Sequence, residues 1–424
     1  MQNKQAITLL FLANIISGLA QGISMVAIPW YFVKIVERPE LFASAYILIT
    51  FLTLFWGLYA GTLIDRYSRK KLFIIINIVC GVSIGTIALY GFQMTYLTDF
   101  LVLLVFGITI FNYNVHYPNL YAFGQEITEP KNYGKLNSYI EVQGQTTSVL
   151  AGAFAALLLT GTQNNVLEIA GISIHLPLDI KAWEIYEVFL MDALTYVAVI
   201  FIFLLMKYKP IVKEKIHKGN LFSRLQGGIQ YLKDNPIIFV FGFLSYMLFA
   251  FTLVEVHVIL PSYVHRFLQM DGNVYASAEI YYSMGAICSG VLILRVFRKI
   301  NTVASIIILL LVVSFAFYGM AVYKLLWVFF AGNLILGIAN AGVRILRTTY
   351  IFNHVPNNLI GRVNSVFSSL NIIVRMLMIG AFALPFFNID DNIRYGYFIG
   401  VGLMFLTLIP LVIWYKRIIS AEKN

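Results

Sequence analysis

The chain has 424 residues, of which 60% are hydrophobic and only 12% are charged, and its mean hydropathy is +0.81. This composition excludes a water-soluble globular domain and indicates an integral membrane protein. The net charge of +10 does not call for a nucleic-acid partner, because the positions of the basic residues follow a membrane topology.

Twelve apolar runs are long enough to cross a bilayer, since one helical crossing needs about 20 residues. The first run is too long for the core of a secretion signal and no small-residue cleavage site follows it, so we expect it to remain as a span. The ninth and tenth runs are separated by little more than Lys324, and together they are about twice too long for one crossing. The expected spans are 8–33, 42–64, 72–92, 98–121, 137–160, 185–206, 236–262, 274–294, 303–323, 325–350, 364–387 and 395–415.

The basic residues predict the orientation of the chain. If the N-terminus is cytoplasmic, 21 of the 30 Lys and Arg residues fall in inner loops and tails, six fall in outer loops and three lie within spans. Cytoplasmic loops carry an excess of Lys and Arg, so this bias predicts a protein of the plasma (inner) membrane with both termini in the cytoplasm. Cys80 and Cys288 both fall within spans, and we therefore expect no disulfide framework.

The chain resembles itself at one offset. Three pairs of segments match at offsets of 227 to 229 residues, and the clearest pair is Gly61–Lys71 with 290–300. Each half holds six spans, which is an even number, so the second half enters the membrane in the same orientation as the first. A parallel repeat of this kind is typical of transporters whose halves move about a site between them. We expect an N-terminal six-helix bundle over 1–206 and a C-terminal one over 236–424.

The segment 207–235 joins the two halves and is the most basic stretch of the chain. Within it Leu221, Leu225, Ile229 and Leu232 recur at helical spacing. This pattern predicts an amphipathic helix that lies on the inner membrane surface.

The loop after the second span carries the sequence GTLIDRYSRKK, which matches the pattern G-x-L-x-D-R-x-x-R-K. With twelve spans and two parallel halves, this segment resembles the major facilitator superfamily over the whole chain. The resemblance implies an all-α membrane protein of two six-helix bundles. It also implies a conformational switch in which Asp65 meets the N-terminal end of helix eleven in the outward-open state. The residues that match the superfamily motif are Gly61, Leu63, Asp65, Arg66, Arg69 and Lys70.

Shorter segments resemble the drug-proton antiporter branch that includes macrolide-efflux and enterobactin-export proteins. They are VAIPWYFVKI in the first span, FLMDALTYV in the sixth, ILPSYV in the seventh and GRVNS before the eleventh. This resemblance implies proton-coupled export of an amphipathic organic molecule by alternating access.

Ionisable residues within spans are costly and mark candidate sites. In the resembled fold the first, fourth, seventh and tenth helices line a central cavity, which favours Glu255 as the proton carrier over a merely interfacial glutamate. His257, two residues later, points to another side of the helix. Glu141 is a weaker candidate for the same role. Asp192 belongs to the peripheral sixth helix, where a structural hydrogen bond is expected.

Basic residues within spans form a second group of candidates. Arg375 lies about 16 Å into its span, at 1.5 Å per residue, and either contacts substrate or belongs to a structural ion pair. Arg344 and Arg347 share one face of the tenth span, and we expect Arg347 to extend its side chain to the membrane surface. His116 is the repeat partner of Arg344, so it is either a substrate contact or a satisfied core histidine.

The first span carries Asn14, Ser17 and Gln21 at i, i+3 and i+7, which places three uncharged polar side chains on one stripe. Asn14 and Gln21 are candidate substrate contacts. The alternative is that the stripe forms hydrogen bonds to neighbouring helices, as polar side chains in membrane bundles do.

The sequence has no phosphate-binding glycine loop, no metal-spaced His and Cys set and no Ser-His-Asp arrangement. We therefore expect a monomeric secondary transporter rather than an enzyme, with no cofactor or metal and with protons, membrane lipid and a small molecule as partners. Transport of an anionic lysolipid or siderophore is the alternative, because His116, Arg344 and Arg375 make the inner half of the bundle positive. A non-transporting receptor with the same fold is another.

Overall fold

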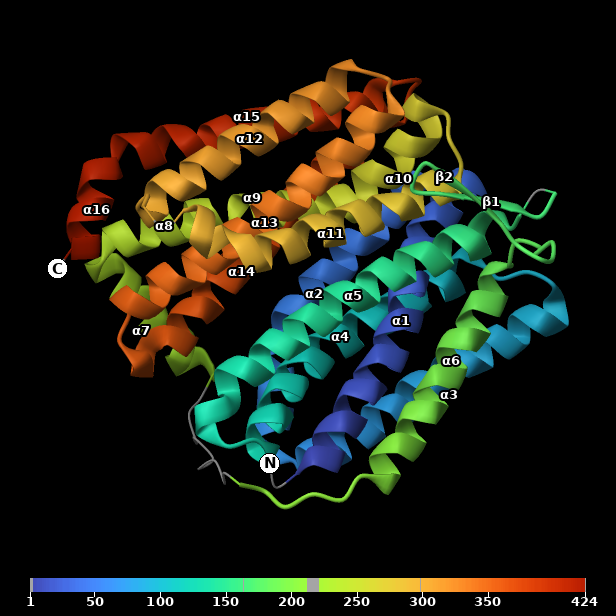
Figure 1. Cartoon of the computed structure of the whole chain (residues 1–424), viewed down its shortest axis with the longest axis horizontal. Coiled ribbons are helices and arrows are strands. Elements are labelled where there is room, and N and C mark those ends of the chain that lie inside the picture. Colours follow the sequence, from blue (N-terminus) through green and yellow to red (C-terminus); the bar gives the residue numbers. More distant parts are fainter. Residues whose placement is uncertain (1–2, 163, 212–220, 298, 424) are drawn as a thin grey trace. The chain divides into compact units, whose positions relative to one another are not determined.

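The computed structural model describes residues 3–162, 164–211, 221–297 and 299–423. Within these residues, twelve helical stretches are long and apolar enough to cross a membrane, which confirms the twelve expected spans and the all-α class (Figure 1). Several helices extend beyond the apolar runs at their polar ends. The first, for example, begins at Lys4 rather than at residue 8.

The first six spans are single long helices. Their bounds are α1 Lys4–Lys34, α2 Pro39–Arg66, α3 Arg69–Met94, α4 Asp99–Ile127, α5 Tyr133–Thr160 and α6 Ile185–Leu205. Between α5 and α6 the chain forms an antiparallel hairpin, with β1 at Val166–Ile169 paired to β2 at Ile172–His175 (Figure 1, green). This hairpin adds a small sheet that the hydropathy pattern did not indicate.

The later spans are less regular. The seventh begins as α8 Pro236–Ser245 and α9 Met247–Val254, and then contains two π-helical segments, η2 Glu255–Ile259 and η3 Tyr263–Leu268, around the short α10 Leu260–Ser262. The remaining α-helices are α7 Leu221–Asp234, α11 Gly272–Val296, α12 Thr302–Val322, α13 Leu326–His354, α14 Asn357–Phe382, α15 Tyr395–Ile413 and α16 Tyr415–Lys423. Three short 3-10 helices, η1 Pro130–Asn132, η4 Pro385–Asn388 and η5 Asn392–Arg394, lie in the connections.

The chain folds into two compact units. The first unit comprises Met1–Glu37, Leu52–Lys218 and Asp271–Ile280, and the second comprises Arg38–Phe51, Gly219–Met270 and Tyr281–Asn424. α2 and α11 therefore each contribute residues to both units. The division into 1–206, 207–235 and 236–424 remains a prediction.

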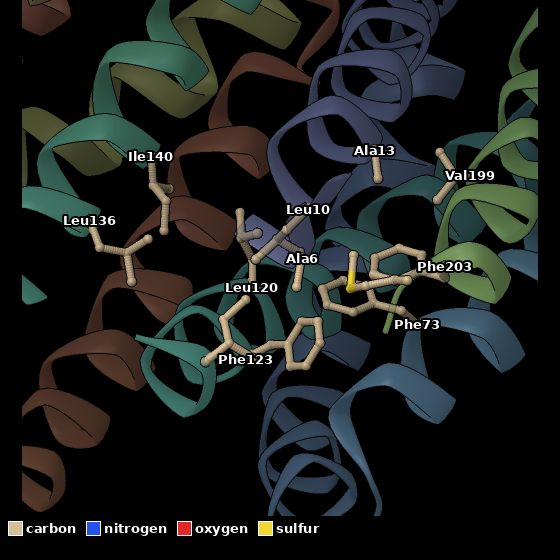
Figure 2. Packing of buried hydrophobic residues seen from close by; sticks show 12 residues of the cluster. Ala6, Leu10, Ala13, Phe73, Leu120, Phe123, Leu136, Ile140, Val199 and Phe203 are labelled. Atoms are coloured by element: carbon tan, nitrogen blue, oxygen red, sulfur yellow. The ribbon is translucent and has the colours of Figure 1, made fainter. Parts of the chain in front are cut away.

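In the first unit α1 packs against α4, α5 and α6, while α3 packs against α6. Near the N-terminal end of α1 these helices enclose an apolar cluster, in which Ala6 and Leu10 lie among side chains from α3, α4, α5 and α6 (Figure 2). The rings of Phe73 and Phe203 stack at 4.7 Å between centroids and join α3 to α6. This contact packs the start of α3, which carries Arg69 and Lys70, against the end of α6.

Residue Asn3 ties the start of the chain to the end of the same bundle. Its side-chain amide donates to the carbonyl oxygens of Ile127 at 3.0 Å and Lys209 at 2.9 Å, and its Oδ1 accepts from the Lys209 backbone N–H at 3.1 Å. The side chain is buried. These three bonds form a clasp between the N-terminus, the end of α4 and the segment after α6.

In the second unit α12 packs against α13 and α15, and α14 packs against α7 and α9. Gly285 of α11 and Gly337 of α13 lie where the backbones approach most closely: a Cβ at Gly337 would collide with the Tyr282 carbonyl oxygen, and one at Gly285 with the Leu334 carbonyl oxygen. Small residues at helix contacts are typical of membrane bundles, because they let the backbones approach.

The expected amphipathic helix forms α7, which confirms helix in this part of the connecting segment. Leu232 is buried, whereas Ile229 remains exposed at the surface of the second unit. The side chains of Leu221 and Leu225 lie outside the described part of the structure. That α7 lies on the inner membrane surface remains a prediction.

Candidate functional site

A polar network crosses the first unit at the level of Asn14. The Asn14 amide nitrogen donates to Gln143 Oε1 of α5 at 2.8 Å, and Asn14 Oδ1 lies 2.8 Å from His116 Nε2 of α4. Because an amide oxygen can only accept, His116 carries its proton on Nε2 in this arrangement. Two of the predicted candidates, Asn14 and His116, are thus brought together, and both are buried.

Gln143 completes this network and retains a free donor. Its Nε2 is buried and has no hydrogen-bond partner among the described residues. A buried polar group without a partner is costly, and a bound ligand is one way in which it is satisfied. The Asn14–His116–Gln143 group therefore offers a hydrogen-bond donor from α5 beside an imidazole and an amide.

The rest of the α1 stripe makes contacts within the first unit. Gln21 Nε2 donates to Ser17 Oγ at 2.7 Å, and the Gln21 side chain also hydrogen-bonds to Tyr196 of α6. The structure thus places Gln21 at a second group of polar residues, away from the bonds that join Asn14 and His116. The alternative that the stripe serves helix packing accounts for Gln21.

Two acidic candidates of the first unit differ in their surroundings. Asp192 is fully buried on α6, and its Oδ2 accepts from Ser24 Oγ of α1 at 3.2 Å, which is the structural hydrogen bond expected there. Glu141 lies partly buried on α5, where Gln145 Nε2 approaches its Oε1 at 3.3 Å. The Glu141–Gln145 contact lies within α5 and does not join Glu141 to the bonds around His116.

In the second unit Glu255 is 0% exposed and stands at the first residue of the π-helical segment η2. Tyr397 of α15 donates its hydroxyl to Glu255 Oε1 at 2.8 Å. π-helical turns within α-helices are rare and occur frequently at functional sites. A carboxyl group within a span, which accepts a hydrogen bond from a neutral hydroxyl at a change of helical geometry, is therefore a candidate for proton exchange.

Arg375 meets a different side of the same span. Its guanidinium, half-buried on α14, lies close enough to interact electrostatically with His257 of η2 and with Tyr46 of α2. The rings of Tyr46 and His257 are in edge contact with centroids 5.6 Å apart. Arg375 Nε is buried and has no hydrogen-bond partner among the described residues. As expected, Glu255 and His257 contact different helices.

The prediction for Arg347 is wrong. Its side chain is only 4% exposed, with Nη1 donating to the Ser245 carbonyl oxygen at 3.0 Å and the guanidinium 3.5 Å from the centre of the Tyr246 ring. The helix breaks between α8 and α9 at Tyr246, so the carbonyl of Ser245 is available to an external donor. Arg344, three residues earlier on α13, is half-buried and lies close enough to interact electrostatically with Arg347.

The basic residues of the loop motif have partners inside the first unit. Arg69 Nη1 lies 2.9 Å from Glu126 Oε2 at the end of α4, and Lys70 Nζ donates to the Met206 carbonyl oxygen at 2.8 Å after α6. Burial and the nearby Glu126 carboxylate raise the pKa of Tyr208. These contacts join the start of α3 to the ends of two other helices.

The remaining motif residues lie on α2. Leu63 packs against a cluster of buried side chains that includes Ala60 and Ile64, Gly61 is exposed, and the Arg66 side chain is exposed beside Tyr67. The side chain of Asp65 lies outside the described part of the structure, so its role in a switch remains a prediction.

Comparison with known proteins identifies the family. The model of the Major Facilitator Superfamily matches residues 10–379. The chain belongs to this superfamily. Its twelve spans therefore make it a multi-pass membrane protein with the superfamily's fold. No curated protein matches the chain.

Solved structures with the same fold cover nearly the whole chain. The nucleoside transporter NupG has a TM-score of 0.69 at 14% identity, covering 97% of this chain and 99% of its own. A bacterial homologue of the iron transporter ferroportin in an inward-facing state has a TM-score of 0.68 at 14% identity, with 96% and 98% covered. A bacterial homologue of the lysosomal transporter Spinster has a TM-score of 0.67 at 14% identity, with 99% and 98% covered. These structural similarities show the fold of this superfamily member.

In this member of the superfamily, four partners of the candidate residues and of the loop motif were not predicted from the sequence. They are Tyr46, Glu126, Gln143 and Tyr397. Gln143 had a detectable signal, because it lies two residues from Glu141 in an apolar span. The tyrosines had none, since the chain has 26 of them and most resemble interfacial aromatic residues in sequence.

Proposed function

We propose that this protein is a secondary transporter of the plasma membrane that exports an amphipathic organic molecule in exchange for protons. The observation that carries the proposal is Glu255, a fully buried carboxyl group at the π-helical turn of the seventh span, with Tyr397 as its hydrogen-bond donor. Protonation of such a group favours one conformation of a transporter and bound substrate favours another, which couples the two fluxes.

The substrate contacts proposed for the first unit are Asn14, His116 and Gln143. They offer one free amide donor and an imidazole, and the rings of Tyr117 and Tyr113 lie nearby, with Tyr117 in edge contact with His116 at 5.5 Å between centroids. A few polar groups beside aromatic rings suit a molecule that has both polar and apolar parts. The loose resemblance to macrolide-efflux proteins supports the same class.

The test begins with a thermal-shift screen of the purified protein against drugs, siderophores and lysolipids, since a ligand at 100 times its Kd adds about 2.7 kcal/mol of stability. The ligand that emerges is then followed in proteoliposomes with a pH gradient of one unit. In a one-to-one exchange such a gradient supports about tenfold accumulation. Counterflow of the same ligand distinguishes a transporter from a receptor, which binds the ligand without exchanging it.

Glu255→Gln is the decisive variant, because glutamine keeps the Oε1 acceptor for Tyr397 and cannot carry a proton. We expect it to bind and exchange the ligand but to lose accumulation driven by the pH gradient. Glu168→Gln, an exposed glutamate of β1, makes the same chemical change and should accumulate normally. Accumulation by Glu255→Gln equal to that of the unmodified protein would move the coupling role to Glu141 or Asp192.

A second candidate is an anionic lysolipid or siderophore. It is favoured by Arg375, whose buried Nε has no hydrogen-bond partner in the described part of the chain and which lies beside His257 and Tyr46. Guanidinium groups bind carboxylates and phosphates through paired hydrogen bonds. Arg375→Lys keeps the charge and loses this geometry, so it should weaken an anionic ligand and leave a neutral or cationic one unchanged.

A further inference from the structure

A groove of about 440 Å³ opens on the second unit where α7, the start of α8 and the middle of α14 meet. Its size falls within the range of about 300–1,000 Å³ that is usual for small-molecule sites. Its lining is apolar except for one lysine and one serine. The lining residues are Ile229, Leu232, Lys233, Phe239, Val366, Ser369, Leu370 and Ile373.

The floor of the groove is built by close packing of α7 on α14. A Cβ at Gly228 would lie 2.6 Å from the Arg362 carbonyl oxygen, so only glycine allows this approach of the two helices. Leu232 and Val366 are buried beneath the groove, whereas Phe239 and Ile373 remain partly exposed along it. The groove is therefore a fixed feature of two packed helices and is open along an apolar side.

The bounds of the candidate spans place one end of the groove at the expected membrane boundary and the other in the expected hydrocarbon region. Lys233 lies on α7, just before Pro236, the first residue of a membrane span. At the other end, Ile373 follows Leu359, where the span of α14 begins, by 14 residues, or about 21 Å of helix. A site with an ammonium group at the boundary and apolar walls reaching this depth suits a long molecule with a polar head.

The charge at the boundary end of the groove favours an anionic head. Lys233 is exposed, and the exposed side chain of Arg362 packs against Gly227 on the same helix pair. The acid beside Lys233, Asp234, accepts from Gln230 Nε2 at 3.1 and 3.2 Å, so its oxygens are engaged along α7. Basic residues near the surface of a membrane each contribute about 1 kcal/mol to binding anionic lipids.

We infer that this groove binds one acyl chain of an anionic phospholipid, with the Lys233 ammonium group at the lipid phosphate. The lipid comes from the surrounding bilayer and occupies the site while α7 stays packed on α14. The inference concerns a separate site from the proposed transport residues, and neither Glu255 nor Arg375 lines the groove.

The test uses the full chain, purified and delipidated in detergent, with phosphatidylglycerol and phosphatidylcholine as probes of matched acyl chains. Native mass spectrometry measures bound lipid and thermal unfolding measures stabilisation. We expect phosphatidylglycerol to bind more tightly than phosphatidylcholine and Lys233→Gln to weaken it about fivefold, as expected for one lost basic contact. Lys299→Gln removes another exposed charge, one outside the groove, and should leave binding unchanged.

A second variant tests the groove itself. Ser369→Trp fills it from the half-buried middle of α14, and we expect both lipids to lose their specific binding while the lipid-free protein unfolds at an unchanged temperature. Equal binding of the two lipids, or equal effects of Lys233→Gln and Lys299→Gln, would refute the anionic headgroup. If Ser369→Trp keeps phosphatidylglycerol but loses the transported ligand, the groove is a substrate site and the inference is wrong. If Ser369→Trp does not fold, Ile373→Trp at the exposed rim replaces it, with the same expected losses.

Discussion

Replacing Arg69 by methionine removes the cation from an ion pair that joins the start of α3 to the end of α4. The pair is short, with 2.9 Å between Arg69 Nη1 and Glu126 Oε2, and its side chains are only 14% and 12% exposed. Breaking a fully buried pair costs about 3–5 kcal/mol, whereas an exposed pair contributes about 0–1 kcal/mol. For this partly buried pair we expect a loss of about 2 kcal/mol, because the Glu126 carboxylate stays behind without its partner.

The measurement is the midpoint of thermal unfolding in detergent, followed by circular dichroism. A loss of this size should lower Tm by about 4–8 °C, since each kcal/mol shifts Tm by about 2–4 °C in a unit of this size. The double variant Arg69→Met with Glu126→Leu should lose less than the sum of the single variants, because it leaves no uncompensated charge. Single variants that each shift Tm by less than about 1 °C, or strictly additive losses, would refute the structural role of this pair.

Three further predictions test topology, the switch and helix packing. An impermeant thiol reagent applied to intact cells should label a cysteine placed at Lys181 and spare one placed at Lys218; the reverse pattern would overturn the topology. Asp65→Asn should insert and fold normally but transport poorly, with the cytoplasmic side more accessible. The reason is that the carboxylate, at a helix N-terminus, is expected to stabilise the outward-open conformation by about 0.3–2 kcal/mol. Normal transport by this variant would show that Asp65 has no role in the switch. Gly337→Ala should destabilise the protein by more than the usual cost of overpacking, which is about 1–3 kcal/mol. Gly402→Ala, where a Cβ has open space around it, should be neutral or slightly stabilising. Equal Tm values for the two variants would show that α11 and α13 can separate without cost.

The sequence was sufficient to predict the spans, because crossing a bilayer depends on the local number of apolar residues. It also indicated Asn14, His116 and Glu255 as candidate site residues, since polar groups are rare in spans and costly there, and their roles remain predictions. The partners of these residues depend on how each helix is rotated about its axis, which hydropathy does not encode. Tyr397 lies 142 residues from Glu255, and only the packed bundle brings them together.

Arg347 shows why position along a span is an incomplete guide. Its place near the end of the span suggested that its charge would reach the membrane surface. Instead, the interruption between α8 and α9 leaves the Ser245 carbonyl available, and the Tyr246 ring covers the guanidinium. The hydropathy pattern gives no sign of that interruption, because α8 and α9 form one continuous hydrophobic segment in sequence. The π-helical turn at Glu255 was invisible for the same reason.

The clasp at Asn3 has a consequence for the biosynthesis of the protein. Two of its three bonds join Asn3 to Lys209, 206 residues further along the chain. At about 5–20 residues per second, translation reaches Lys209 roughly 10–40 s after it passes Asn3, so Asn3 cannot form these two hydrogen bonds before then. We therefore expect the clasp to close only after the sixth span has been inserted. A fluorophore attached at the N-terminus would then report completion of the first bundle during translation, and a bulky N-terminal fusion would delay that step more than a C-terminal one.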